Sequence, residues 1–277
     1  SGAVRGGTGR AYPGKLIEPV RFSHLKTIGT LSPAHLAARV EFKPTASMER
    51  GTAVHAILFG TREVVAYHGR RAGKAWDEFK AVYGDEAHVL TASEYAKAQD
   101  MAAAVRAHPW ASKLLGPGAV YERTILWKHC DIACRSTPDI AHADWIVDLK
   151  TSRTSKPDWF GSLAVKSFYH AQMAFYGEAR RASGRPAPKF YYVICVESFA
   201  PYVVTCFKFT ERAIDAGNKL WRAWFEKLVV AHTSGEWTPY TQAIEEIDVM
   251  DEFEAEFGSP QIVTFGDEEE QADAVAA

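Results

Sequence analysis

The sequence predicts an α/β (α+β) fold in which a central mixed β-sheet is flanked by helices. Three observations support this prediction. Helix signals dominate the first third of the chain, aromatic and β-branched stretches dominate residues 120–150, and two further strand patterns lie between long helix patterns in the remainder. Strands combined with helices in this way are typical of a sheet covered by helices on both faces.

Helix-start signals place four helices before residue 110. Ser32 and Pro33 suit an N-cap and a first helical position, and Ser47 is the expected cap of the second helix. The sequence Thr-Ala-Ser-Glu at 91–94 is a capping-box pattern. The four expected helices cover residues 34–40, 47–58, 74–83 and 92–108.

Strand patterns follow in the centre of the chain and again near residue 200. The expected strands cover residues 120–128, 130–135, 145–150, 190–197 and 202–209, with a turn around Pro201. Two long helices are expected over residues 159–182 and 210–233.

Length and composition indicate one large domain with extensions. The chain has 277 residues, of which 47% are apolar and 24% charged, as in soluble globular proteins. It has no apolar run as long as a membrane span and no signal-peptide pattern at its start, so a cytoplasmic protein is expected. We expect a disordered segment over 1–20, a folded domain over 21–242 and an acidic, flexible tail over 243–277.

The net charge of −2 hides an asymmetry along the chain. Residues 243–277 hold twelve acidic and no basic residues, so the remainder carries 32 basic and 22 acidic residues, a balance of +10. A positive body suits a polyanionic ligand. The acidic tail is interpreted as a solubilising extension, with docking on a partner or competition with nucleic acid as alternatives.

The four cysteines do not have the spacing of a metal site. Cys130, Cys134, Cys195 and Cys206 match neither a zinc ribbon nor a cluster-binding pair, so neither zinc nor an iron–sulfur cluster is expected. All four are expected to be reduced and mostly buried, with Cys130 and Cys134 on one face of one strand.

A pair of aspartates and a lysine carry the chemical signal. Asp139 follows a proline, and Asp148 and Lys150 lie on one face of an expected strand because side chains alternate there. A turn at residues 141–144 would place Asp139 beside Asp148 in a hairpin. Two carboxylates can hold a hard cation, and a lysine can stabilise charge on a transferring phosphate. Solvated surface charge is the alternative reading of such a short motif.

Other polar residues have both structural and functional interpretations. Gly51, inside an expected helix, costs about 1 kcal/mol relative to alanine and so indicates a close approach there. His55 is either a hydrogen-bonded core residue or a ligand, and Glu122 is either a surface charge or an additional ligand. Spacing puts three side chains on one helix face, where they either rest on the sheet or line the site: Tyr169, Gln172 and Tyr176.

Taken together, these segments resemble the PD-(D/E)XK nuclease superfamily, and within it the phage and prophage exonuclease VIII (RecE-type) group. The resemblance covers residues 22–240. It rests on the order of several short motifs: Ser23, Leu25, 32–35 (Ser-Pro-Ala-His), Gly51, His55, Glu122, 138–139 (Pro-Asp), 148–151 (Asp-Leu-Lys-Thr), Tyr169, His170, Gln172, Tyr176, Gly235, Trp237 and Tyr240.

The resemblance implies a Mg²⁺- or Mn²⁺-dependent exodeoxyribonuclease with a restriction-endonuclease-like core. Such an enzyme acts on double-stranded DNA ends in the 5′ to 3′ direction and leaves 3′ single strands for a strand-annealing protein in recombination. By the same resemblance, Lys150, Asp139, Asp148 and Glu122 would be catalytic, Gln172, Tyr176 and Tyr169 would contact substrate, and the metal ligands would be His55, Asp139, Asp148 and the backbone carbonyl of Leu149.

The resemblance also implies a ring-like homo-oligomer encoded by a phage or prophage and acting in a bacterial cell. One departure from the family pattern is Thr137, where an arginine usually precedes Pro-Asp; Arg135 lies two positions earlier. Two alternatives stay open: a catalytically silent nuclease-like DNA-binding or assembly module, and a single-strand nuclease or endonuclease in defence.

Overall fold

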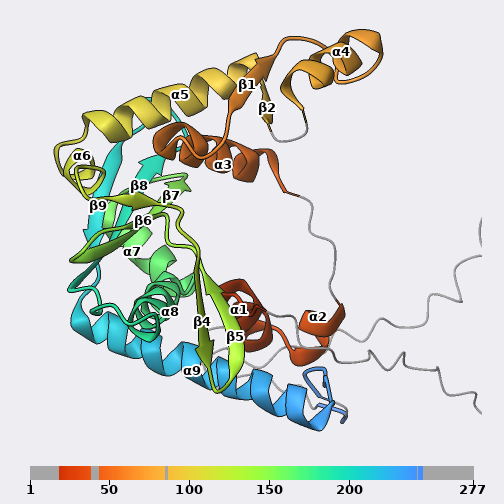
Figure 1. Ribbon diagram of the computed structural model, residues 1–277, viewed down its shortest axis with the longest axis vertical. Helices are drawn as coiled ribbons and strands as arrows, with labels where there is room; N and C mark the ends of the chain where they lie inside the picture. Colours follow the sequence, from red (N-terminus) through yellow and green to blue (C-terminus); the bar gives the residue numbers. More distant parts are fainter. Residues whose placement is uncertain (1–18, 39–43, 85–86, 242, 246–277) are drawn as a thin grey trace, which may run out of the picture. The chain divides into compact units, whose positions relative to one another are not determined.

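A five-stranded mixed sheet lies at the centre of the protein, as the computed structural model shows for residues 19–38, 44–84, 87–241 and 243–245 (Figure 1). Neighbouring strands follow the order β3 (Val120–Tyr121), β6 (Ile140–Ala141), β7 (Trp145–Ser152), β8 (Phe190–Glu197) and β9 (Val204–Lys208). The β7–β8 pair is parallel and the other pairs are antiparallel. The predicted fold class is confirmed.

The chain divides into two units at residues 240 and 241, and every described helix and strand belongs to the first unit. None of the helices in the described ranges combines the length and the apolar character needed to cross a membrane.

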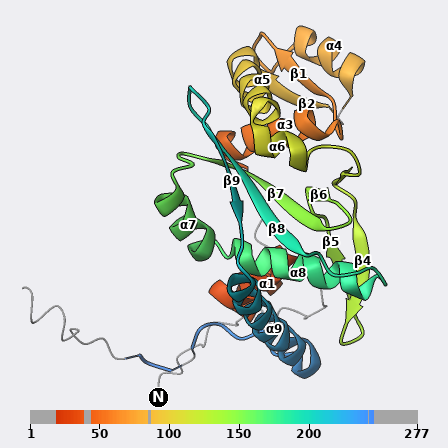
Figure 2. The same cartoon turned by 90° about the vertical axis from the view of Figure 1, so that its left-hand side faces the viewer.

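Helices cover both faces of the sheet, because β7 is apolar on both sides (Figure 2). Ile146 packs in one cluster with α1 (Phe22–Thr30), α8 (Tyr169–Ala182) and α9 (Glu211–Ser234). Val147 and Leu149 pack on the other side with α3 (Ala46–Phe59) and α5 (Ala92–Ala107). This alternation leaves Asp148 and Lys150 on the side of Ile146, as the two-residue period of a strand requires.

Smaller elements complete the described part of the chain. A parallel pair that the sequence reading missed consists of β1 (Val64–Tyr67) and β2 (His88–Thr91). An antiparallel hairpin is formed by β4 (Ile125–His129) and β5 (Ile132–Ser136). The short helices are α2 (Pro33–Ala38), α4 (Lys74–Tyr83), α6 (Pro109–Leu114) and α7 (Pro157–Lys166).

Three predicted elements are wrong in detail because the backbone turns within them. The strand expected over 120–128 breaks into β3 and β4 at Glu122, which has φ 43°. Cys130 lies exposed in the β4–β5 turn with φ 47°, so it does not share a strand face with Cys134. The helix expected over 159–182 is two helices, separated at Phe168 with φ 64°.

The N-cap of α3 differs from the predicted residue, whereas the N-cap of α5 agrees with it. The cap of α3 is Thr45, not Ser47, since the Thr45 hydroxyl accepts from the Met48 amide at 3.4 Å. Thr91 caps α5 as expected, but the Glu94 carboxylate contacts the Arg50 guanidinium at 2.6 Å and so joins α5 to α3. Residues 39–40 of the first expected helix, and the N-terminal segment and most of the tail, lie outside the described residues.

Candidate active site

The β6–β7 pairing brings the two predicted aspartates together. Ile140 pairs with Val147 and Ala141 with Ile146, so the antiparallel register continues to Asp139 opposite Asp148. The Leu149 amide donates to Asp139 Oδ2 at 2.7 Å. β6 begins at Ile140, and this bond therefore fixes the Asp139 carboxylate against the edge of β7 just before the first paired residue of β6.

Lys150 lies beside Asp148 at the same edge. Its Nζ is 2.5 Å from Asp148 Oδ2, and the Asp148 side chain is only 2% exposed. That oxygen has no hydrogen bond of good geometry within the described residues, so its contact with Lys150 is an ion pair. Burial lowers the pKa of Lys150, but the Asp148 and Asp139 carboxylates outweigh it and raise the pKa above its ordinary value. Lys150 is thus held as a cation.

His55 reaches this edge from α3. Its Nε2 is 3.1 Å from the Leu149 carbonyl oxygen, and its Nδ1 is 3.6 Å from Asp139 Oδ1 and 3.8 Å from Glu122 Oε1. Gly51 permits the approach, because a Cβ there would lie 3.1 Å from the Thr151 hydroxyl of β7. The close approach expected at Gly51 is therefore present.

Glu122 lies in the site although it is not in a strand. Its amide donates to the Asp139 carbonyl at 2.9 Å, directly after β3 ends. Contacts with His55 are the main cause that lowers the pKa of its carboxyl. The Glu122 side chain is 31% exposed and its carboxylate lies 3.8 Å from the imidazole, so it is a partly exposed charge paired with His55.

The charges of Asp139, His55 and their neighbours shift the pKa values of both groups, so that this part of the site favours binding of protons or of a cation. Burial, opposed by His55 and reinforced by Asp148, raises the pKa of Asp139 to about 6. Burial lowers the pKa of His55, but Asp139 and Glu122 together raise it above its ordinary value. Negative charge is thus concentrated at one point and only partly neutralised by the chain itself.

The predicted face of α8 covers the site. Lys150 Nζ lies 4.8 Å from the centre of the Tyr169 ring. Gln172 donates to the Tyr176 hydroxyl at 2.9 Å. Burial first, and then the Asp148 and Asp139 charges, raise the pKa of Tyr176.

Three neighbours were not found from the sequence. Lys26 of α1 donates to the Ser167 carbonyl, and burial and then the Lys150 charge lower its pKa. Thr61 and Arg62 line a pocket of about 440 Å³ together with His55 and Glu122, and Thr61 also hydrogen-bonds Glu122. Thr61 and Arg62 follow the end of α3, and Lys26 lies on α1. Their positions in the sequence have no fixed spacing from any of the motifs, so the sequence did not indicate them.

The donor set fits a divalent cation, although it is not arranged as a closed cage. Among the described residues, no group of three or more His, Cys, Asp or Glu side chains is already in place to hold a metal ion. The reason is visible in the contacts, because Leu149 engages Asp139 Oδ2 and Lys150 engages Asp148 Oδ2. Ligands about 2.0–2.2 Å from one cation lie roughly 3–4 Å apart, which is compatible with the spacing of His55, Asp139 and Glu122.

Comparison with known proteins identifies the class of domain. Residues 22–250 match the family described as "PDDEXK-like domain of unknown function (DUF3799)", and the chain belongs to this family. The predicted PD-(D/E)XK nuclease superfamily is confirmed at that level. No curated protein matches the sequence.

Solved structures support the fold alone. A protein from Eubacterium rectale described as "Putative exonuclease" is 12% identical, with 86% of this chain and 93% of that chain covered and a TM-score of 0.55. An alkaline exonuclease from Laribacter hongkongensis is 16% identical over 47% of this chain and 68% of that one. Its TM-score of 0.28 is too low to support an argument.

Proposed function

We propose that the protein is a divalent-metal-dependent exodeoxyribonuclease that hydrolyses phosphodiesters at the ends of linear double-stranded DNA. The observation that carries this proposal is the meeting of Asp139, Asp148 and Lys150 at one edge of β7, with His55 brought there by α3. One buried and one partly buried carboxylate have little structural use in such proximity, since like charges repel. They do suit hydrolysis of a phosphodiester.

The chain's own groups supply positioning and charge. Lys150, fixed by Asp148 and the Tyr169 ring, would orient the attacking water and stabilise charge that develops on the phosphate. Gln172 and Tyr176 form a hydrogen-bonded pair that would line the substrate side of the site. The Tyr176 hydroxyl accepts from Gln172 and keeps its own proton to donate.

Mg²⁺, or Mn²⁺ in its place, would be held by His55, Asp139, Asp148 and the Leu149 carbonyl, with Glu122 beside them. The cation would supply Lewis-acid polarisation of the phosphoryl oxygen. Metal binding needs a neutral imidazole and an ionised Asp139, so it would displace protons from groups whose pKa values are raised in the metal-free protein.

The finer parts of the proposal concern polarity and partners. We propose 5′ to 3′ degradation that leaves 3′ single strands for an annealing protein in recombination, a ring-like homo-oligomer, and a phage or prophage origin with action in the bacterial cytoplasm. These proposals rest on the motif resemblance described above. A nuclease-like module without turnover, and a single-strand nuclease or endonuclease, are the competing functions.

The test compares linear and circular DNA. Purified protein with Mg²⁺ is expected to degrade end-labelled linear duplex and to leave a closed circle intact, and labels on opposite ends of one strand give the polarity. Asp148→Asn should abolish product, whereas Asp158→Asn, an exposed carboxylate on α7, should act as wild type.

Each alternative has its own signature in this experiment. Cleavage of the circle would indicate an endonuclease, and cleavage of single strands alone would indicate a single-strand enzyme. Duplex binding with no product under Mg²⁺ or Mn²⁺, by wild type and Asp148→Asn alike, would refute hydrolysis.

A further inference from the structure

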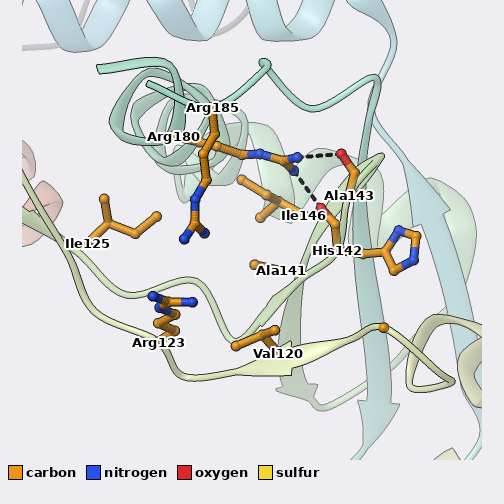
Figure 3. A pocket seen from close by; sticks show the side chains of 10 residues that line it. Val120, Arg123, Ile125, Ala141, His142, Ala143, Ile146, Arg180 and Arg185 are labelled. Atoms are coloured by element: carbon orange, nitrogen blue, oxygen red, sulfur yellow. Dashed lines mark hydrogen bonds between the residues drawn. The ribbon is translucent and has the colours of Figure 1, made fainter. Parts of the chain in front are cut away.

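A pocket lined by arginines lies outside the candidate active site. It has a volume of about 220 Å³ and is bounded by the β3 and β6 strands and the end of α8. Arg123, Arg180 and Arg185 line it, with Val120 and Ile146 among its apolar walls. Figure 3 shows the guanidinium groups of Arg123 and Arg185 pointing toward each other across the space.

Neither Arg123 nor Arg185 forms a salt bridge among the described residues, and the carboxylate that acts on Arg180 is Asp144, which is itself paired with Lys189. The salt bridges nearby join Lys189 to Asp144 and two other arginines to Glu178, and none includes Arg123 or Arg185. Arg180 is 7% exposed and donates to the His142 and Ala143 carbonyl oxygens. Burial, and then the charge of Arg185, lower the pKa of Arg180, as expected where like charges face one another.

The backbone fixes where these cations stand. The Arg185 amide donates to the Arg180 carbonyl at 3.2 Å, so the turn after α8 places both side chains at one wall. Arg123 follows Glu122 at the point where β3 ends, and it comes from the opposite wall. Two exposed cations therefore face each other beside a third that the fold holds in place.

The pocket and the active site are neighbours along the sheet. Val120, Ala141 and Ile146 pair across β3, β6 and β7, and two residues further along the same face the register places Asp139 and Asp148. Two strand residues span about 7 Å, so the backbone of the pocket and that of the carboxylates lie close enough for one DNA strand to contact both. On α8, Tyr176 and Arg180 are four residues apart and so lie on one side of the helix.

We propose that this pocket binds a phosphate of the DNA backbone near the scissile bond, with Arg123 and Arg185 as the contacting groups and Arg180 as their fixed support. The inference rests on the proposed nuclease function and adds a substrate-anchoring site to it. Guanidinium groups suit this role because they donate two parallel hydrogen bonds to phosphate oxygens.

The experiment measures DNA binding separately from cleavage. Anisotropy titrations of a short labelled duplex without divalent metal compare wild type, Arg123→Gln/Arg185→Gln and the control Arg212→Gln, an exposed arginine on α9. Loss of one phosphate contact should make the slope of log K against log salt shallower by about 0.9. At about 0.1 M salt the affinity of the variant should then be about eightfold below that of wild type, if the two affinities are equal at about 1 M salt. Arg123→Lys/Arg185→Lys should recover most of the affinity.

Two substrate arms identify the phosphate. Equal losses on 5′-phosphorylated and 5′-hydroxyl duplexes support an internal phosphodiester, and a loss confined to the phosphorylated end supports the same pocket with a terminal phosphate as ligand. If the double glutamine variant folds, as judged by its melting temperature, and binds like Arg212→Gln, the inference is overturned. Failure of the proposed function is distinct, since wild type would then bind DNA and release no product with Mg²⁺.

Discussion

Replacing Lys150 with methionine tests the electrostatic account of the site most directly. The change removes the cation 2.5 Å from Asp148 and leaves two carboxylates facing each other with only 2% of the Asp148 side chain exposed. Breaking a buried ion pair costs about 3–5 kcal/mol, and Lys150 is 22% exposed, which favours the lower end, about 3 kcal/mol. At about 2–4 °C per kcal/mol, the melting temperature should fall by about 6–12 °C.

Thermal denaturation followed by circular dichroism at neutral pH, in chelator, measures this loss. Lys166→Met, an exposed lysine on α7, is the matched control and should shift stability by less than about 0.5 kcal/mol. Asp148→Asn/Lys150→Met should be more stable than the sum of the single changes predicts, by at least about 1 kcal/mol. Additive losses, or a Lys150→Met protein that melts with the control, would refute the reasoning.

Three further predictions concern pH, helix packing and the tail. Because the pKa of Asp139 is raised to about 6, its carboxyl stabilises the metal-free fold at low pH, and this contribution is lost as pH rises through about 6. Protons also compete with the metal ion for this carboxyl. The rise in melting temperature that Mn²⁺ causes should therefore be large at about pH 7.5 and small at about pH 5. Gly217→Ala should cost about 1–3 kcal/mol in urea denaturation, since its Cβ would lie 2.5 Å from the His170 carbonyl oxygen, whereas Gly161→Ala on α7 meets nothing within 4 Å and should stabilise. Removal of residues 243–277 changes the net charge from −2 to +10 and should raise duplex affinity at low salt, and equal salt titrations of both proteins would contradict a competing tail.

The sequence motifs predicted several side-chain contacts of the site, because local periodicity determines side-chain direction. Asp148 and Lys150 share a face of β7 since strand residues alternate, and Gln172 and Tyr176 meet since α8 brings residues four apart together. The turn after Ala141 set the register that brings Asp139 opposite Asp148. These relations lie within one or two adjacent elements, so sequence spacing was sufficient.

Breaks inside elements were not predictable in this way. Glu122 and Phe168 adopt positive φ without being glycine, and no residue pattern marks them. Tertiary packing compensates the strain at both points. β3 and β4 join different partner strands on either side of Glu122, and the Phe168 ring packs on Trp224 at 5.0 Å between centres.

By itself, the sequence determined the α/β layering, the order of the motifs and the carboxylate–lysine edge of β7, because these follow from hydrophobic period and short-range register. Only the tertiary structure decided that His55 faces Glu122 as well as Asp139, and that Arg123 and Arg185 share a pocket. His55 and Glu122 are far apart in the chain, as are the two arginines. Such contacts are fixed by how α3 and α8 pack on the sheet to which β3 belongs, and no local pattern encodes that packing.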